Sequence, residues 1–226
     1  MRLPHLLKSV LLAAGVAVAG TIAAGDARAD ETCNSPYTTK LITGQEDYVY
    51  VWTLGVEGAG DGSDKLVTVD VHPKSKTYGK VLGSVSVGTR GEAHHMGFTD
   101  DRRFIWAGGL AESKIYVFDI ATDPARPKLV KTIGDMADKT GYLGPHTYYA
   151  LPGRMLVQAL SNTKDKGGVT GMALYNNQGE FLAAYPMPTD GGGDGDPAGS
   201  VREIYSSAFL HPRTVLNDIE TLLMEP

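Results

Sequence analysis

The sequence predicts an all-β protein folded as a β-propeller, and three observations lead to this prediction. Short runs rich in β-branched and aromatic residues alternate with turns rich in Gly, Pro, Asn and Asp, as in proteins built of strands. Helical periodicity is missing from every long window before residues 215–224, which fit a short helix. One strand pattern occurs twice at a spacing of about 50 residues, and such a period favours propeller blades over a sandwich or a barrel.

The repeated pattern begins with a histidine-containing strand in each copy. The first copy reads Glu92-Ala-His-His-Met-Gly-Phe98, and the second reads Gly144-Pro-His-Thr-Tyr-Tyr149. Both copies continue, after a short turn, with an arginine and an apolar strand. Superposition of the copies places His95 on His146. Equivalent positions of successive blades lie at the same height around one central channel, so we expect both imidazoles to face that channel.

The other strands follow in chain order from the same pattern. Tyr48–Leu54 alternates aromatic and β-branched residues, Lys65–Val71 and Lys114–Ile120 read alike, and Gly171–Asn176 fits the same position in its unit. Asn177-Gln-Gly179 is typical of a hairpin turn. Four strands per unit match a propeller blade. The predicted strands are 48–54, 65–71, 80–87, 96–99, 104–107, 114–120, 128–133, 147–150, 155–160, 170–175 and 180–185.

A weaker third copy of the repeat begins at Tyr205 and has Ser206 at the position of the histidine. A propeller closes with about 4–8 blades, whereas this sequence supplies about three full units and part of a fourth. We therefore expect an incomplete propeller of three to four blades. Its open blade edges would favour self-association into a homo-oligomer.

The first 29 residues have the pattern of a cleaved secretory signal peptide. Arg2 and Lys8 precede an apolar run over residues 10–24, and Ala27-Arg-Ala29 supplies small residues for cleavage. A membrane anchor is the alternative, but the run is interrupted by glycine and is shorter than the about 20 residues that a span needs. We expect residues 30–226 to form the partial propeller domain in the periplasm, without membrane association after cleavage.

Charge and cysteine usage exclude several classes of protein. A net charge of −5, a pI near 5.7 and the lack of a basic patch argue against nucleic-acid binding. The single cysteine, Cys33, cannot form an internal disulfide, and it is either a reactive free thiol or an ordinary residue near the mature N-terminus. The sequence contains neither a nucleophile elbow nor the spaced acidic pattern of a calcium loop.

His94, His95 and His146 are the candidate metal ligands. Neutral imidazoles bind copper, zinc, iron or nickel. Neighbours on a regular strand point to opposite faces, so His94 and His95 can share one ion only if the backbone turns there. Polar residues at strand ends are the alternative interpretation. Glu92 is a candidate acceptor for the N–H of a ligand imidazole, with an exposed loop carboxylate as the alternative.

Three further residues carry weaker signals. His72 and His211 each precede a proline at a turn, which favours a surface position. Met96 offers a soft sulfur to copper. A methionine that follows two histidines on an apolar strand is nevertheless more often part of the core.

Several separated motifs resemble those of the selenium-binding protein / methanethiol oxidase family. The double histidine after a glutamate and the later histidine-threonine are the most specific. The family's selenium-linked cysteine falls where this chain reads Tyr50-Val-Trp-Thr53, so selenium binding is not implied. The motifs occur in the family's order: Cys33–Tyr37, Thr68–Ser75, Glu92–Gly97, Lys114–Asp119, Arg126–Leu129, Pro145–Thr147 and Lys166–Gly168.

The resemblance implies a fold, an activity and a cofactor. Members of the family are similar to seven-bladed propellers, and bacterial members are exported copper enzymes. They oxidise methanethiol with O2 and water to formaldehyde, hydrogen sulfide and hydrogen peroxide. The resemblance implies copper at His94, His95 and His146, with a small thiol and O2 as partners. Because the family continues for about as many residues again, the alternative is a non-catalytic propeller binding or scaffold protein, a truncated remnant of the oxidase.

Overall fold

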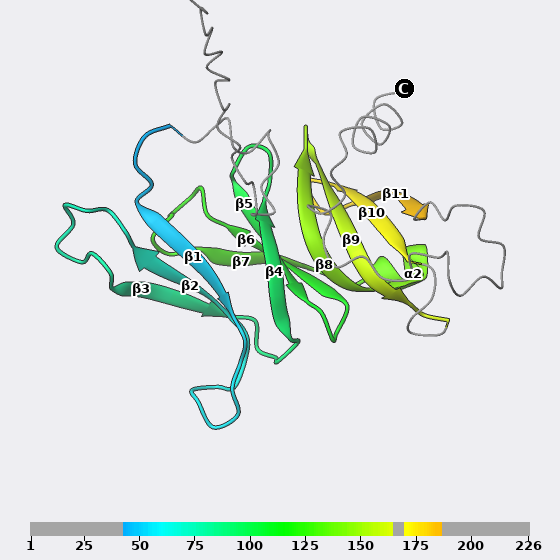
Figure 1. Ribbon diagram of the computed structural model, residues 1–226, viewed down its shortest axis with the longest axis horizontal. Coiled ribbons are helices and arrows are strands. Elements are labelled where there is room, and N and C mark those ends of the chain that lie inside the picture. Colours follow the sequence, from blue (N-terminus) through cyan, green and yellow to red (C-terminus); the bar gives the residue numbers. More distant parts are fainter. Residues whose placement is uncertain (1–42, 165–169, 187–226) are drawn as a thin grey trace, which may run out of the picture.

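The computed structural model describes residues 43–164 and 170–186, and these residues form three antiparallel sheets (Figure 1). Strands that follow one another in the chain are neighbours within each sheet, as in a propeller blade. The first sheet contains β1 (Tyr48–Thr53), β2 (Lys65–Asp70) and β3 (Val81–Ser86). The middle sheet contains β4 (Ala93–Phe98), β5 (Phe104–Gly109), β6 (Lys114–Asp119) and β7 (Lys128–Ile133). The last sheet contains β8 (Tyr142–Leu151), β9 (Arg154–Asn162), β10 (Gly171–Asn176) and β11 (Phe181–Pro186).

Strands β5 and β6 of the middle sheet are buried on both faces because this sheet lies between the other two. On β5, Ile105 and Ala107 pack with Leu66 of the first sheet. Between them in the sequence, Trp106 packs with Val157 of the last sheet. Successive side chains of a strand point to opposite faces, so a strand covered on both sides must be apolar at consecutive positions. This arrangement explains why β5 and β6 are apolar runs without polar alternation.

The outer strands are covered on one face only. On β11 every second residue is exposed, including Leu182. On the first sheet, Val49, Val51 and Val81 are 45%, 40% and 63% exposed. An exposed apolar face of this kind favours association.

Self-association through open edges stays a prediction, and sedimentation velocity checks it. A protein that remains monomeric as its concentration rises would contradict it.

The structure confirms the predicted fold class, with successive four-stranded blades in the middle and last sheets. It corrects two details. First, β4 and β8 begin earlier than predicted, so all three candidate histidines lie within strands. Second, an unpredicted helix, α2 (Met136–Thr140), follows β7. Its five residues are too few to show periodicity, and it ends at Gly141, whose φ of 74° is left-handed.

Other sequence predictions fall outside the described part of the chain. They are the signal peptide, Cys33, the weak third repeat with Ser206 and His211, and the short helix over residues 215–224. Within the described ranges, no helix is both long enough and apolar enough to cross a membrane.

Candidate metal centre

Strands β4 and β8, the inner strands of the middle and last sheets, lie side by side (Figure 1). Gly97 permits this approach, because a Cβ added there would lie 2.8 Å from Cβ of Tyr148 and 3.0 Å from its carbonyl oxygen. Gly108 on β5 is equally confined, since its added Cβ would lie 2.7 Å from the carbonyl oxygen of Pro145. Glycines of the middle sheet therefore bring the two histidine-bearing strands into contact.

Each of these strands has a β-bulge at its histidine position. The register of β4 against β5 shifts between Ala93 and Met96, around the two adjacent histidines. The register of β8 against β9 shifts between Pro145 and Tyr148, around the histidine of that strand. A bulge inserts an extra residue and breaks the strict alternation of side chains. The backbone irregularity that lets neighbouring histidines share a site is thus present, and it recurs in the next blade.

The three imidazoles converge on one point. The ring centroids of His94 and His95 are 4.7 Å apart, those of His94 and His146 are 4.6 Å apart, and those of His95 and His146 are 4.3 Å apart. Each residue offers a ring nitrogen, and the nitrogens lie within 4.8 Å of one another. Metal–nitrogen bonds of about 2.0–2.1 Å place two ligand nitrogens up to about 4 Å apart. The largest separation, 4.8 Å, exceeds this value by less than about 1 Å.

The electrostatics of the site favour neutral imidazoles. His146 is 2% exposed, and burial together with the neighbouring His95 and His94 lowers its pKa from 6.5 to about 4. Burial and the neighbouring His94 also lower the pKa of His95. Both rings are therefore unprotonated at neutral pH, which is the form that binds a metal ion.

One ring nitrogen of His146 is buried and, within the described ranges, unpaired. Its Nδ1 atom is buried and has no hydrogen-bond partner among the described residues. Within a cluster of three imidazoles, such a nitrogen is available to bind an ion. Over residues 43–164 and 170–186, this is the one group of His, Cys, Asp and Glu side chains with ligand atoms close enough to share an ion.

The remaining candidates do not belong to the group of convergent imidazoles. Glu92 is exposed with a left-handed φ of 61°, and its carbonyl oxygen accepts a hydrogen bond from the backbone N–H of Leu110 at 3.2 Å. Its role as an acceptor for an imidazole stays a prediction. Met96 packs against the core between the first and middle sheets. His72 lies at a turn, with Nε2 3.9 Å from Oδ1 of Asp47.

Sequence reasoning missed the residues that support the two bulges. Gln158 on β9 lies opposite the bulge of β8 and accepts a hydrogen bond from Oγ1 of Thr147, both side chains being buried. Gly108 lies opposite the bulge of β4, and its carbonyl oxygen accepts a bond from Nε1 of Trp52 at 2.9 Å. A glutamine inside the apolar run of residues 155–160 was the available signal, because a polar residue there needs a buried partner.

Replacing Thr147 by valine tests the support of the β8 bulge. The change keeps the shape of the side chain but removes the hydroxyl donor to Gln158. We expect the free energy of unfolding to fall by about 1–3 kcal/mol, because this buried hydrogen bond is lost. Urea unfolding of the metal-free protein measures the change. Thr122→Val, which removes an exposed bond to Asp119, is the control and should change stability by less than about 0.5 kcal/mol. Equal effects of the two substitutions would contradict the prediction.

Comparison with known proteins gives a family and a fold. The model of the 56 kDa selenium-binding protein family (SBP56) matches residues 27–188. A solved structure, a hypothetical selenium-binding protein from Sulfolobus tokodaii, superposes with a TM-score of 0.58 at 28% identity. That alignment covers 66% of this chain and 36% of the other.

Two curated relatives are more similar in sequence. The chain is 55% identical to a methanethiol oxidase from Hyphomicrobium sp, over 97% of this chain and 52% of the relative. It is 56% identical to a methanethiol oxidase from Ruegeria pomeroyi, over 77% of this chain and 41% of the relative. The chain thus spans about half the length of the curated relatives that it matches.

Proposed function

Because the chain belongs to the 56 kDa selenium-binding protein family, we propose that it is a copper-dependent methanethiol oxidase of the periplasm. The reaction converts methanethiol, O2 and water to formaldehyde, hydrogen sulfide and hydrogen peroxide. The observation that carries the proposal is the convergence of His94, His95 and His146 from two blades, with ligand atoms within 4.8 Å of one another. The 55% and 56% identity to methanethiol oxidases supports the choice of reaction.

The redox balance of the proposed reaction restricts the choice of metal. The carbon of methanethiol loses an electron pair, O2 gains it and becomes hydrogen peroxide, and water supplies the oxygen of formaldehyde while sulfur leaves as hydrogen sulfide. Zinc has no redox chemistry. Copper bound to the three imidazoles would supply electron exchange with O2 and affinity for soft sulfur. The reaction therefore argues against zinc, and the resemblance to copper-dependent oxidases favours copper over the other metals that imidazoles bind.

The residues of the chain have distinct parts in this proposal. His146 is buried, whereas His94 is exposed, so His146 would hold an ion from its interior side. A small thiol would then reach the centre from the side of His94. The low pKa values of His95 and His146 keep both rings available as ligands at neutral pH. The periplasmic location rests on the signal-peptide pattern of residues 1–29.

Metal analysis combined with a turnover assay tests the proposal. The purified protein is stripped of metal, reloaded with copper or zinc, and assayed for methanethiol consumption and hydrogen peroxide release. We expect turnover with copper and none with zinc. A protein that binds no transition metal and oxidises no methanethiol would contradict the proposal. Copper binding without turnover would instead fit the alternative, a non-catalytic propeller binding protein.

A further inference from the structure

Asp64 is a buried carboxylate that connects the first sheet to the strand carrying His94 and His95. It is 0% exposed. Its Oδ1 atom accepts a hydrogen bond from the backbone N–H of Gly55 at 2.7 Å, and its Oδ2 atom accepts one from the backbone N–H of Gly91 at 3.0 Å. Gly91 directly precedes Glu92 and β4. One side chain thus joins the end of β1 to the start of the histidine-bearing strand.

The backbone of Asp64 fixes the same segment. Its N–H donates to the carbonyl oxygen of Thr89 at 2.8 Å, and its own carbonyl oxygen accepts from the N–H of Val87 at 3.1 Å. The Asp64 residue therefore contacts residues 87–91 through both its main chain and its side chain. The connection between the first and middle sheets is held at several points rather than one.

The middle sheet fixes this segment from the opposite side. Oγ1 of Thr89 donates to Oε1 of Glu112 at 2.7 Å. The carbonyl oxygen of Gly91 accepts from the N–H of Ala111 at 3.0 Å. A Cβ added at Gly91 would lie 2.9 Å from Oε2 of Glu112 and 3.3 Å from Cα of Gly109, so a side chain there would displace the Glu112 carboxylate. The chain thus begins β4 from a position fixed on both sides.

The charge of Asp64 makes this arrangement costly. Within the described ranges, no Lys, Arg or His forms an ion pair with it. A buried carboxylate without a cation is unfavourable unless its oxygens accept strong hydrogen bonds. Here two backbone N–H groups from different segments supply them, which fixes those segments relative to each other.

We propose that Asp64 is a positioning residue for the metal centre, which holds the start of β4 so that the following bulge directs His94 and His95 toward His146. The proposal rests on the metal centre of the proposed function. Asp64 contacts no ligand atom itself, and it acts through Gly91 and the strand that follows. Copper binding should therefore depend on a side chain of the loop that precedes β2.

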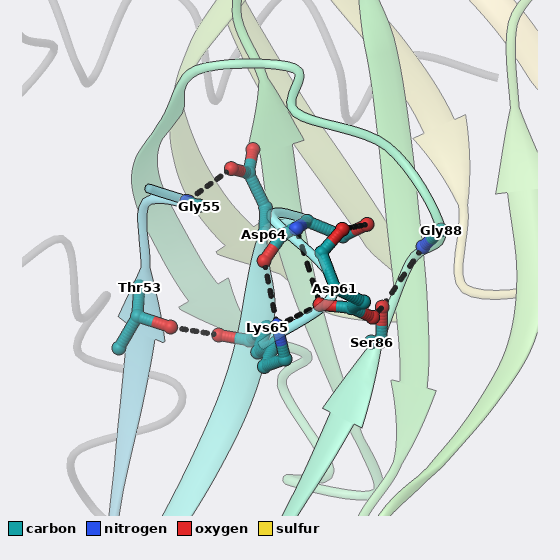
Figure 2. Close-up of polar contacts among 8 residues, drawn as sticks. Thr53, Gly55, Asp61, Asp64, Lys65, Ser86 and Gly88 are labelled. Atoms are coloured by element: carbon teal, nitrogen blue, oxygen red, sulfur yellow. Dashed lines mark hydrogen bonds and ion pairs between the residues drawn. The ribbon is translucent and has the colours of Figure 1, made fainter. Parts of the chain in front are cut away.

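The chain offers a matched control on the same loop. Asp61 is an exposed carboxylate that accepts hydrogen bonds from Lys65, Ser86 and the backbone N–H of Ser63, and no hydrogen bond joins it to residues 89–92. Figure 2 shows the bond from Gly55 to Asp64 beside the separate network of Asp61, Lys65 and Ser86. Asp64→Asn and Asp61→Asn are thus the same chemical change at neighbouring positions, and only the first alters the support of β4.

The test compares these two variants with the wild type by copper titration and by the electron paramagnetic resonance spectrum of bound Cu²⁺. In Asp64→Asn an amide N–H₂ group faces one of the two backbone N–H groups, so one hydrogen bond is lost. We expect its copper affinity to fall about 10- to 100-fold, as for the loss of groups that orient metal ligands, with an altered spectrum. Asp61→Asn should match the wild type in both measurements.

A second measurement needs no copper. In the metal-free protein, NMR ring signals of His94 and His95 should shift in Asp64→Asn and stay unchanged in Asp61→Asn. If the wild type binds no copper, the proposed function fails, while the ring signals still decide the role of Asp64. Asp64→Ser, which removes the charge and keeps one acceptor, replaces Asp64→Asn if that variant does not fold. Lower thermal stability with unchanged ring signals and copper affinity would overturn the proposal.

Discussion

Replacing His146 by alanine should remove copper from the protein and abolish methanethiol oxidation. Among the described residues, His146 is the one candidate ligand on the last sheet, and the other two imidazoles come from adjacent positions on β4. Without it the centre has two ligands from one strand and no ligand on its buried side. We expect the copper content after gel filtration to fall from roughly one ion per chain to near none. Elemental analysis and methanethiol consumption measure the two effects.

Thermal unfolding separates the loss of a ligand from the loss of the fold. Copper that binds only the folded wild type should raise its melting temperature, and it should leave that of His146→Ala unchanged. The metal-free variant should remain folded, because alanine also removes a buried nitrogen without a partner. His72→Ala, which removes a turn histidine outside the cluster, should keep copper and activity. Wild-type copper content in His146→Ala would refute the assigned site.

Replacing Gly97 by alanine should separate the two inner strands. The added Cβ would lie 2.8 Å from Cβ of Tyr148 and 3.0 Å from its carbonyl oxygen, and neither atom can move by a side-chain rotation. Overpacking of this kind lowers the free energy of unfolding by about 1–3 kcal/mol. Because β4 and β8 carry the ligands, the separation should also weaken copper binding. Chemical unfolding and copper titration measure the two effects.

Gly134 provides the control for this substitution. A Cβ added at Gly134 meets nothing within 4 Å, and its φ lies outside the left-handed region. Gly134→Ala should therefore change neither stability nor copper affinity measurably. If Gly97→Ala behaved like Gly134→Ala, the contact between β4 and β8 would not be the close approach that places the histidines together.

The strands were predictable because their pattern is local. Runs such as Lys114–Asp119 are rich in β-branched and aromatic residues and are bounded by turns. The helix Met136–Thr140 was not predictable, because its five residues do not complete the spacing that identifies a helix. The packing of the middle sheet between two others was also hidden. The composition of an apolar strand shows that both of its faces are buried, but it does not show which other sheets cover them.

The cluster of three histidines was predictable as a group of residues, whereas the backbone features that bring them together were not. The repeat aligned His95 with His146, but the two bulges depend on the pairing of β4 with β5 and of β8 with β9. Asp64 carried no recognisable signal, because an aspartate in a glycine-rich turn is ordinary turn chemistry. Its role depends on a contact with Gly91, 27 residues away.

The sequence by itself determined that this protein is built of repeated β-units and that three histidines occupy their inner strands. Periodicity and composition encode this much, because they reflect the local alternation of each strand. Only the tertiary structure decided that the three rings meet, that a bulge lies at each histidine position, and that the buried carboxylate of Asp64 bonds to Gly91 just before β4. These features arise from contacts between segments distant in the chain, and no local pattern of residues specifies such contacts.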